Sequence, residues 1–178
     1  MQKLTLISVL AMLCLHTNAQ KTPALKPLSI GDAVPDIVFN NVINYKDSTI
    51  RLSDFKGKLV ILDFWAPYCA SCIKVFPKID SLQEKYHDQI QFISVAITFG
   101  TGKFGVDAVK TLFPRLRNEG RGKYNFPVVV YTPDQLLELF PHQGFPFYAW
   151  IDKNRKAYAF TGYQLLDAQT IEIFLRNY

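Results

Sequence analysis

The stretch that decides the fold runs from residue 59 to residue 72 and reads LVILDFWAPYCASC. Residues 59–64 form a continuous apolar run with β-branched residues, bounded by a glycine and a proline, which predicts a strand buried on both faces. After Cys72, apolar side chains recur every three or four residues with polar ones between them, which is typical of an amphipathic helix. Asp63 is the one charged residue inside the apolar run, and it is therefore a candidate functional residue.

Cys69 and Cys72 lie where the predicted strand gives way to the predicted helix. Unpaired N–H groups and the helix dipole stabilise a thiolate at the start of a helix and lower its pKa, so Cys69 is the predicted nucleophile. Cys72 lies one turn deeper, where it can attack a mixed disulfide at Cys69 and release the partner. A disulfide that closes so short a loop restrains the unfolded chain little, so the pair would stabilise the fold poorly as a structural cross-link. An inert buried pair is the alternative.

The same spacing also occurs in zinc sites, but such sites need two further ligands. Outside the first nineteen residues the chain offers only His87 and His142 as histidines, and neither has a metal-ligand spacing. We therefore expect no metal. The net charge is +5, but the lysines and arginines are scattered along the chain. A solvated surface explains that pattern better than a nucleic-acid or membrane patch, so we expect no nucleic-acid partner.

The 178 residues suffice for one domain and a short leader. Residues 1–19 have the pattern of a signal peptide, because Lys3 precedes an apolar run and small residues follow it at 17–19. A retained anchor and a lipoprotein modified at Cys14 are the alternatives. Residues 20–30 are predicted to be a flexible spacer and residues 31–178 the folded domain. The leader predicts export to the periplasm or cell envelope, where a disulfide can form.

The remaining chain alternates between strand and helix patterns. Strand, helix and strand in this order predict a parallel pair joined by a right-handed crossover. The predicted elements are a hairpin of residues 34–40 and 49–52, strands at 89–97 and 126–131, helices at 106–116 and 134–140, a second hairpin of 146–151 and 156–161, and a last helix with Asp167 as its N-cap.

The segment 63–72, DFWAPYCASC, resembles the active-site stretch of the thioredoxin superfamily. The leader, the Gly-Asp and Pro-Asp steps in residues 31–36, and the approach LSDFKGK at 52–58 resemble the exported TlpA and ResA branch. The resemblance covers residues 31–178. It implies an α/β thioredoxin-like fold with a central mixed β-sheet flanked by helices, an N-terminal hairpin, and a helix and strand inserted in residues 98–143 before a cis-proline loop.

The resemblance also implies roles for individual residues. Cys69 would be the attacking thiolate and Cys72 the resolving thiol. Asp63, six residues before Cys69, matches the buried carboxylate that takes up the proton of the resolving thiol, and burial would raise its pKa toward neutrality. A carboxylate paired only for structural reasons is the alternative for Asp63. Pro146 matches the cis-proline, which predicts a cis peptide bond between Phe145 and Pro146.

The neighbours of these residues are predicted to bind the partner. Trp65, Pro67, Tyr68 and Phe145 are the expected substrate-binding residues, and Phe145 is bulkier than the Thr, Val or Ile common before the cis-proline. Trp65, Tyr68, Phe145, Phe147 and Tyr148 could together form an apolar docking patch, although core packing explains about half of them equally well. Between the cysteines the chain has Ala-Ser in place of the Gly-Pro of thioredoxin, and this dipeptide helps to set the reduction potential.

The predicted function is dithiol-disulfide exchange with exported proteins that carry cysteine thiols or disulfides. The family suggests a reductase that receives electrons from a membrane-bound donor and needs no cofactor. A thiol peroxidase is a second possible function for this fold. Peroxiredoxins, however, place Thr and Pro shortly before a cysteine that lacks a second cysteine beside it, and this sequence does not match that pattern. A non-catalytic thioredoxin-like binding module is a third, and the intact cysteine pair argues against it.

Overall fold

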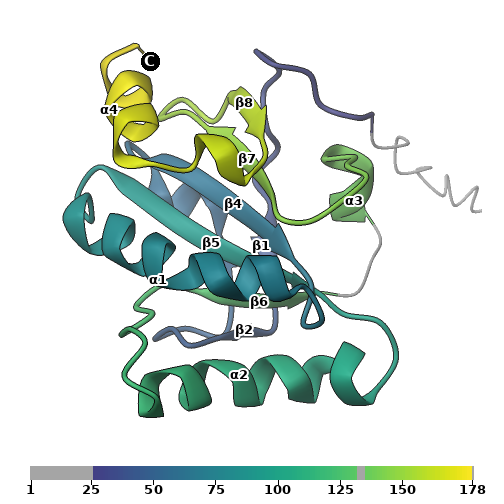
Figure 1. The fold of residues 1–178 in the computed structure, drawn as a ribbon. Helices are drawn as coiled ribbons and strands as arrows, with labels where there is room; N and C mark the ends of the chain where they lie inside the picture. Colours follow the sequence, from purple (N-terminus) through teal and green to yellow (C-terminus); the bar gives the residue numbers. More distant parts are fainter. Residues whose placement is uncertain (1–25, 132–134, 178) are drawn as a thin grey trace, which may run out of the picture.

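The computed structural model describes residues 26–131 and 135–177. The predicted signal peptide and Asp134, the first residue of the helix predicted at 134–140, therefore lie outside the described residues. A six-stranded mixed sheet forms the middle of the molecule, with strand order β2-β6-β5-β4-β7-β8 (Figure 1). β4 pairs in parallel with β5, which pairs in parallel with β6, while β2, β7 and β8 run antiparallel to their neighbours. The strands are β2 (Val42–Ile43), β4 (Leu59–Trp65), β5 (Ile90–Ile97), β6 (Val128–Tyr131), β7 (Phe147–Ile151) and β8 (Ala157–Thr161).

One face of the sheet is covered by α1 (Ala70–Lys85), α2 (Val106–Asn118) and α4 (Ala168–Asn177), as Figure 1 shows. The buried apolar residues of these helices pack in one cluster with the β4 residues Leu59, Ile61 and Trp65. Because side chains alternate along a strand, Asp63 also points to this face. The carboxyl group is thereby placed on the side of the sheet that α1 covers.

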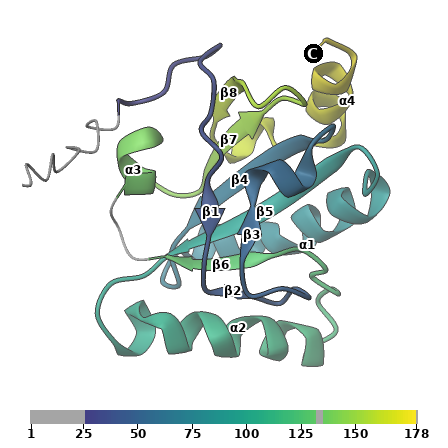
Figure 2. The ribbon, with the colours of Figure 1, turned by 180° about the vertical axis from the view of Figure 1, so that it is seen from behind.

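The other face is covered by the hairpin of β1 (Val38–Phe39) and β3 (Ile50–Arg51) and by the short helix α3 (Gln135–Leu139), which lie in front of the sheet in Figure 2. Buried residues of these elements pack with Val60, Leu62 and Phe64, the alternate residues of β4. All seven residues of β4 are buried, which confirms the strand predicted from the apolar run.

The predicted mixed sheet, N-terminal hairpin and inserted helix and strand are confirmed. Between the two strands of the hairpin the chain forms an additional short strand, β2, which joins the main sheet by pairing with β6. β6 begins at Val128, two residues later than predicted, and Pro127 before it has no N–H to donate. Asp167 caps the last helix, since its Oδ1 accepts a hydrogen bond from the Thr170 N–H at 2.7 Å.

The N-terminal segment joins the fold earlier than residue 31. The N–H of Leu28 donates to the carbonyl of Leu139 at 2.9 Å, and the Leu28 side chain packs against the hairpin side of the core. The spacer predicted to reach residue 30 is therefore too long at its C-terminal end. No helix in residues 26–131 and 135–177 is long and apolar enough to cross a membrane.

Candidate active site

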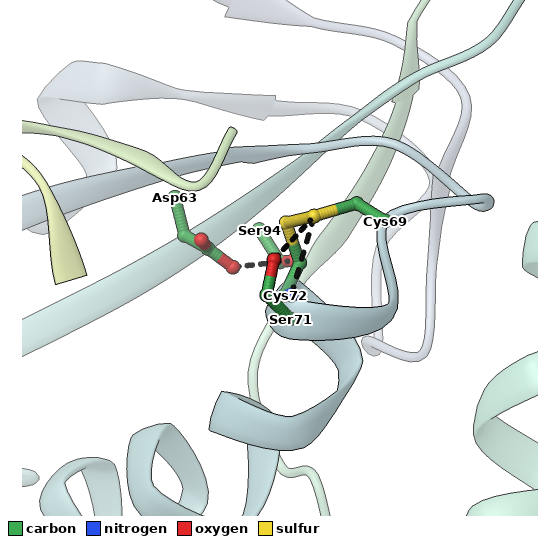
Figure 3. The surroundings of a disulfide bond; sticks show 5 residues. All are labelled: Asp63, Cys69, Ser71, Cys72 and Ser94. Carbon is green, nitrogen blue, oxygen red and sulfur yellow. Dashed lines mark hydrogen bonds between the residues drawn. A yellow bond between two sulfur atoms is a disulfide. The ribbon is translucent and has the colours of Figure 1, made fainter. Parts of the chain in front are cut away.

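The two cysteines form a disulfide at the start of α1, with their Cα atoms 5.3 Å apart (Figure 3). Cys69 is the N-cap residue, and its Sγ accepts a hydrogen bond from the backbone N–H of Cys72 at 3.2 Å. The Ser71 Oγ lies 3.3 Å from the same sulfur, and it must be the donor because a disulfide sulfur has no hydrogen. Two donors therefore point at Cys69 Sγ, where they would stabilise negative charge after reduction.

A tight turn between β4 and α1 sets this geometry. The N–H of Cys69 donates to the carbonyl of Ala66 at 2.9 Å, and Pro67 lies inside the turn, where no N–H is needed. Cys69 has an extended backbone, with φ −81° and ψ 92°, and the helix begins at the next residue. This places the Cys69 sulfur beside the unpaired N–H groups of the first helical turn.

The two sulfurs differ in accessibility. The Cys72 side chain faces the core and is only 1% exposed, whereas Cys69 is partly exposed. A partner protein can therefore reach Cys69, while Cys72 is reached from within the molecule. This asymmetry is the one required of an attacking and a resolving cysteine.

Asp63 lies in the middle of β4 and is 1% exposed. Its Oδ2 accepts a hydrogen bond from Ser94 Oγ on β5 at 3.2 Å, as Figure 3 shows, whereas its Oδ1 has no partner within the described chain. Burial raises the pKa of this carboxyl group to about 7, although the hydrogen bond from Ser94 opposes the shift. A group with this pKa can accept and release a proton near neutral pH.

The cis-proline loop lies beside the turn before Cys69. The peptide bond between Phe145 and Pro146 is cis, as the resemblance predicted. Tyr68 and Phe145, which precede Cys69 and Pro146 respectively, line one groove of about 460 Å³. Its lining residues are Tyr68, Ile97, Phe99, Leu137, Pro141, His142, Gln143, Gly144 and Phe145.

The predicted docking patch is wrong for Trp65 and Tyr148, because both are fully buried. Trp65 is the last residue of β4, and its ring makes edge contacts with Phe76 of α1 and Phe113 of α2. Tyr148 lies on the same face of the sheet. Strand alternation turns both side chains into the core, so neither can contact a partner.

Of the predicted binding residues, Tyr68 is the most open, with 50% of its surface exposed. Pro67, Phe145 and Phe147 are partly buried, and Phe147 stacks on His142 with ring centroids 4.5 Å apart. The structure thus brings Cys69, Tyr68 and Phe145 to one surface and leaves Asp63 and Cys72 beneath it.

Three residues near the site escaped sequence reasoning, and a fourth, Ser71, was noted only as part of the dipeptide between the cysteines. Ser71 donates to Cys69, Ser94 donates to Asp63, and Phe99 and His142 line the groove. Ser94 pairs with Asp63 in the parallel register of β4 and β5, which the sequence does not specify. The position of Ser71 between the cysteines is the only signal that could have revealed one of the four in advance. The described residues contain no group of three or more metal-ligating side chains.

Comparisons with known proteins agree with this geometry. Residues 39–125 match the family model described as Thioredoxin. The chain is 28% identical over 156 residues to the thiol-disulfide oxidoreductase ResA of Geobacillus thermodenitrificans, covering 88% of this chain and 82% of that protein. It is 29% identical over 127 residues to ResA of Geobacillus kaustophilus, covering 71% of this chain and 66% of that one.

Solved structures show the same relationship. The exposed lipoprotein thioredoxin Etrx1 of Streptococcus pneumoniae superposes with a TM-score of 0.64 at 27% identity, covering 81% of this chain and all of that one. The fold, the cysteine pair at the start of α1 and these relatives agree. The chain therefore has a thioredoxin-like fold and is similar to the thiol-disulfide oxidoreductases named ResA, which supports an oxidoreductase.

Proposed function

We propose that the protein reduces disulfides of exported proteins through the pair Cys69 and Cys72. The observation that carries the proposal is the asymmetric disulfide at the start of α1: Cys69 is partly exposed and its sulfur accepts two hydrogen bonds, whereas Cys72 is buried. The leader pattern in residues 1–19 supports export, and the resemblance of the sequence to the TlpA and ResA branch implies the reductive direction.

The exchange proceeds in two balanced steps. The Cys69 thiolate attacks one sulfur of a partner disulfide, which forms a mixed disulfide and releases the other partner sulfur as a thiolate. Cys72 then loses its proton and attacks Cys69 Sγ. The bond between Cys69 and Cys72 forms, the bond between Cys69 and the partner breaks, and the partner leaves with both sulfurs reduced. The enzyme has lost the two electrons that the partner gains, and a membrane-bound dithiol donor would restore them.

Asp63 is the proposed acceptor of the Cys72 proton. A thiol attacks a disulfide only as the thiolate, so Cys72 needs a base that takes its proton before it can attack. Asp63 faces α1 from the strand below, and its pKa of about 7 lets it take a proton from the thiol and later release it. The carboxyl group thus acts in the second step, after the partner has bound.

The groove beside the cis-proline is the proposed binding site for the partner. Backbone groups of the loop around Pro146 would pair with an extended partner segment, while Pro67, Tyr68 and Phe145 contact its side chains. The groove adjoins the turn that carries Cys69, so a partner seated there presents its own sulfur to Cys69.

Replacing Cys72 by alanine is expected to trap partners as mixed disulfides, because the second step is then blocked. The variant should be expressed with its leader, and covalent complexes should be separated on non-reducing gels and identified by mass spectrometry. The matched control is the double variant Cys69→Ser/Cys72→Ala, which should form none. If no complex at Cys69 accumulates where a control oxidoreductase traps its partners, thiol exchange is not the activity.

The direction of the reaction can be tested by equilibrating the protein with glutathione buffers. A reduction potential well below the poise of the exported compartment would support a reductase. A value near or above that poise would instead indicate an oxidase or an isomerase and would contradict the reductive proposal.

Phe145→Ala is expected to weaken partner binding, because it removes an apolar wall of the groove. Losing one partly buried aromatic contact should cost about 1–2 kcal/mol, which lowers kcat/KM by about 5- to 30-fold, mainly through KM. The measurement is steady-state reduction of a protein disulfide. Tyr163→Ala is the control, since Tyr163 is 54% exposed and is not among the groove residues. An unchanged KM in Phe145→Ala would exclude the groove as the binding site.

A further inference from the structure

Three buried polar side chains form a row across the middle of the sheet. Asp63 on β4 pairs directly with Tyr148 on β7 in the antiparallel register and with Ser94 on β5 in the parallel register. Directly paired residues on neighbouring strands project to the same face, which here is the face that α1 covers. All three residues are at most 1% exposed, so their polar atoms must be satisfied inside the protein.

The hydrogen bonds within this row are incomplete. Ser94 Oγ donates to Asp63 Oδ2, but neither Asp63 Oδ1 nor the Tyr148 hydroxyl has a hydrogen-bond partner in the part of the chain that the structure describes. Tyr148 and Asp63 also interact electrostatically. The pKa of Tyr148 is raised, first by burial and then by the negative charge of Asp63, so the hydroxyl keeps its proton. An unused donor and an unused acceptor therefore lie on two directly paired residues.

A tyrosine hydroxyl suits a carboxyl group that changes its protonation state. The carboxylate only accepts hydrogen bonds, whereas the carboxylic acid also donates one. A neutral hydroxyl can do both by turning its hydrogen, and it donates more strongly to the charged form than it accepts from the neutral one. Among titratable and polar groups, Tyr148 faces Asp63 from β7, Ser94 faces it from β5, and the cysteine pair lies at α1. The Trp65 indole N–H, two residues along β4 on the same face, is a second donor without a partner in the described residues. No lysine, arginine or histidine contributes to the titration of Asp63 within the described residues.

We propose that Tyr148 is a positioning residue for Asp63: the Tyr148 hydroxyl, unpaired in this structure, turns to bind the free oxygen of the carboxyl group when that group is charged, while Ser94 binds the other oxygen. The proposal rests on the role of Asp63 in the proposed function and extends it. Two uncharged hydroxyls then hold the carboxyl group facing α1 and set how readily it takes up the proton of Cys72. The buried base is thus positioned by two uncharged hydroxyl groups and needs no buried cation beside it.

Tyr148→Phe tests the proposal, because it removes the hydroxyl and keeps the ring that packs in the core. The readout is the titration of the Asp63 carboxyl carbon by NMR in the oxidised protein, in which the cysteines do not titrate. Loss of a donor to the carboxylate should raise the pKa of Asp63 by about one unit. Ser94→Ala should raise it similarly, and the control Tyr163→Phe should leave it unchanged.

An Asp63 midpoint that stays at the wild-type value in Tyr148→Phe, while Ser94→Ala moves it, would overturn the proposal. If Tyr148→Phe does not fold, the wild-type protein provides a second test. The ring carbon that bears the Tyr148 hydroxyl should then shift with the same midpoint as Asp63, and a flat signal would overturn the inference. Neither measurement involves a partner or turnover, so a negative result here is distinct from a failure of the exchange activity.

Discussion

With the Cys69→Ser variant, protein disulfides are expected to be reduced no faster than in the absence of enzyme. Cys69 is the only sulfur of the pair that a partner can reach, and a serine hydroxyl cannot form a disulfide with it. Neither step of the exchange can then occur, whatever the state of Cys72. The measurement is reduction of a disulfide protein such as insulin with a chemical dithiol as electron source. Residual catalysis well above background would show that the reaction does not begin at Cys69.

Variants of the two cysteines also distinguish the alternative functions. A peroxidase would consume hydrogen peroxide rapidly and independently of protein thiols, and Cys69→Ser would abolish that reaction. A non-catalytic binding module would still work without either sulfur. If the double variant Cys69→Ser/Cys72→Ser bound the natural partner and fully replaced the wild-type protein in a deletion strain, the binding module would be the correct function.

Asp63→Asn is expected to change how the stability of the oxidised protein depends on pH. The folded-state pKa of Asp63 is raised from 3.8 to about 7, so between these values the folded protein binds a proton that the unfolded chain does not. The contribution of Asp63 to the free energy of unfolding is therefore fully present below pH 3.8 and is lost as the pH rises toward 7. The total loss is about 4 kcal/mol in wild type, at about 1.4 kcal/mol per pH unit, and it is absent in the variant.

Urea unfolding of both proteins between pH 4 and pH 8 measures this difference. The free energy of unfolding of Asp63→Asn, minus that of wild type, should grow with pH up to about 7 and then level off. Groups such as His142 titrate in both proteins and cancel in the subtraction. A difference that stays constant across the range would mean that Asp63 titrates normally and cannot serve as the base for Cys72.

Sequence reasoning located the reactive centre because its signals are local. The apolar run, the change to helical periodicity and the two cysteines lie within 14 consecutive residues and define β4, α1 and the N-cap position of Cys69. The conspicuous charge at Asp63 was equally visible. Its burial followed from the strand, and the pKa of about 7 follows from that burial.

Contacts between segments that lie far apart in the sequence could not be predicted from local patterns. The pairing of Asp63 with Ser94 and Tyr148 depends on the register of three strands, which no local pattern specifies. Trp65 was misassigned because its position next to the motif outweighed strand alternation, which turns it toward Phe76 and Phe113. Strand β2 was missed because two residues are too short for a periodicity.

That short strand also affects how the molecule behaves among copies of itself. β2 lies at one edge of the six-stranded sheet and contains only Val42 and Ile43. Exposed sheet edges invite intermolecular strand addition, and very short edge strands are one way in which proteins prevent it. A two-residue edge offers too few free amide groups to template a neighbouring chain. The chain between the two hairpin strands thus leaves this edge of the sheet with little free backbone for a neighbouring molecule to pair with.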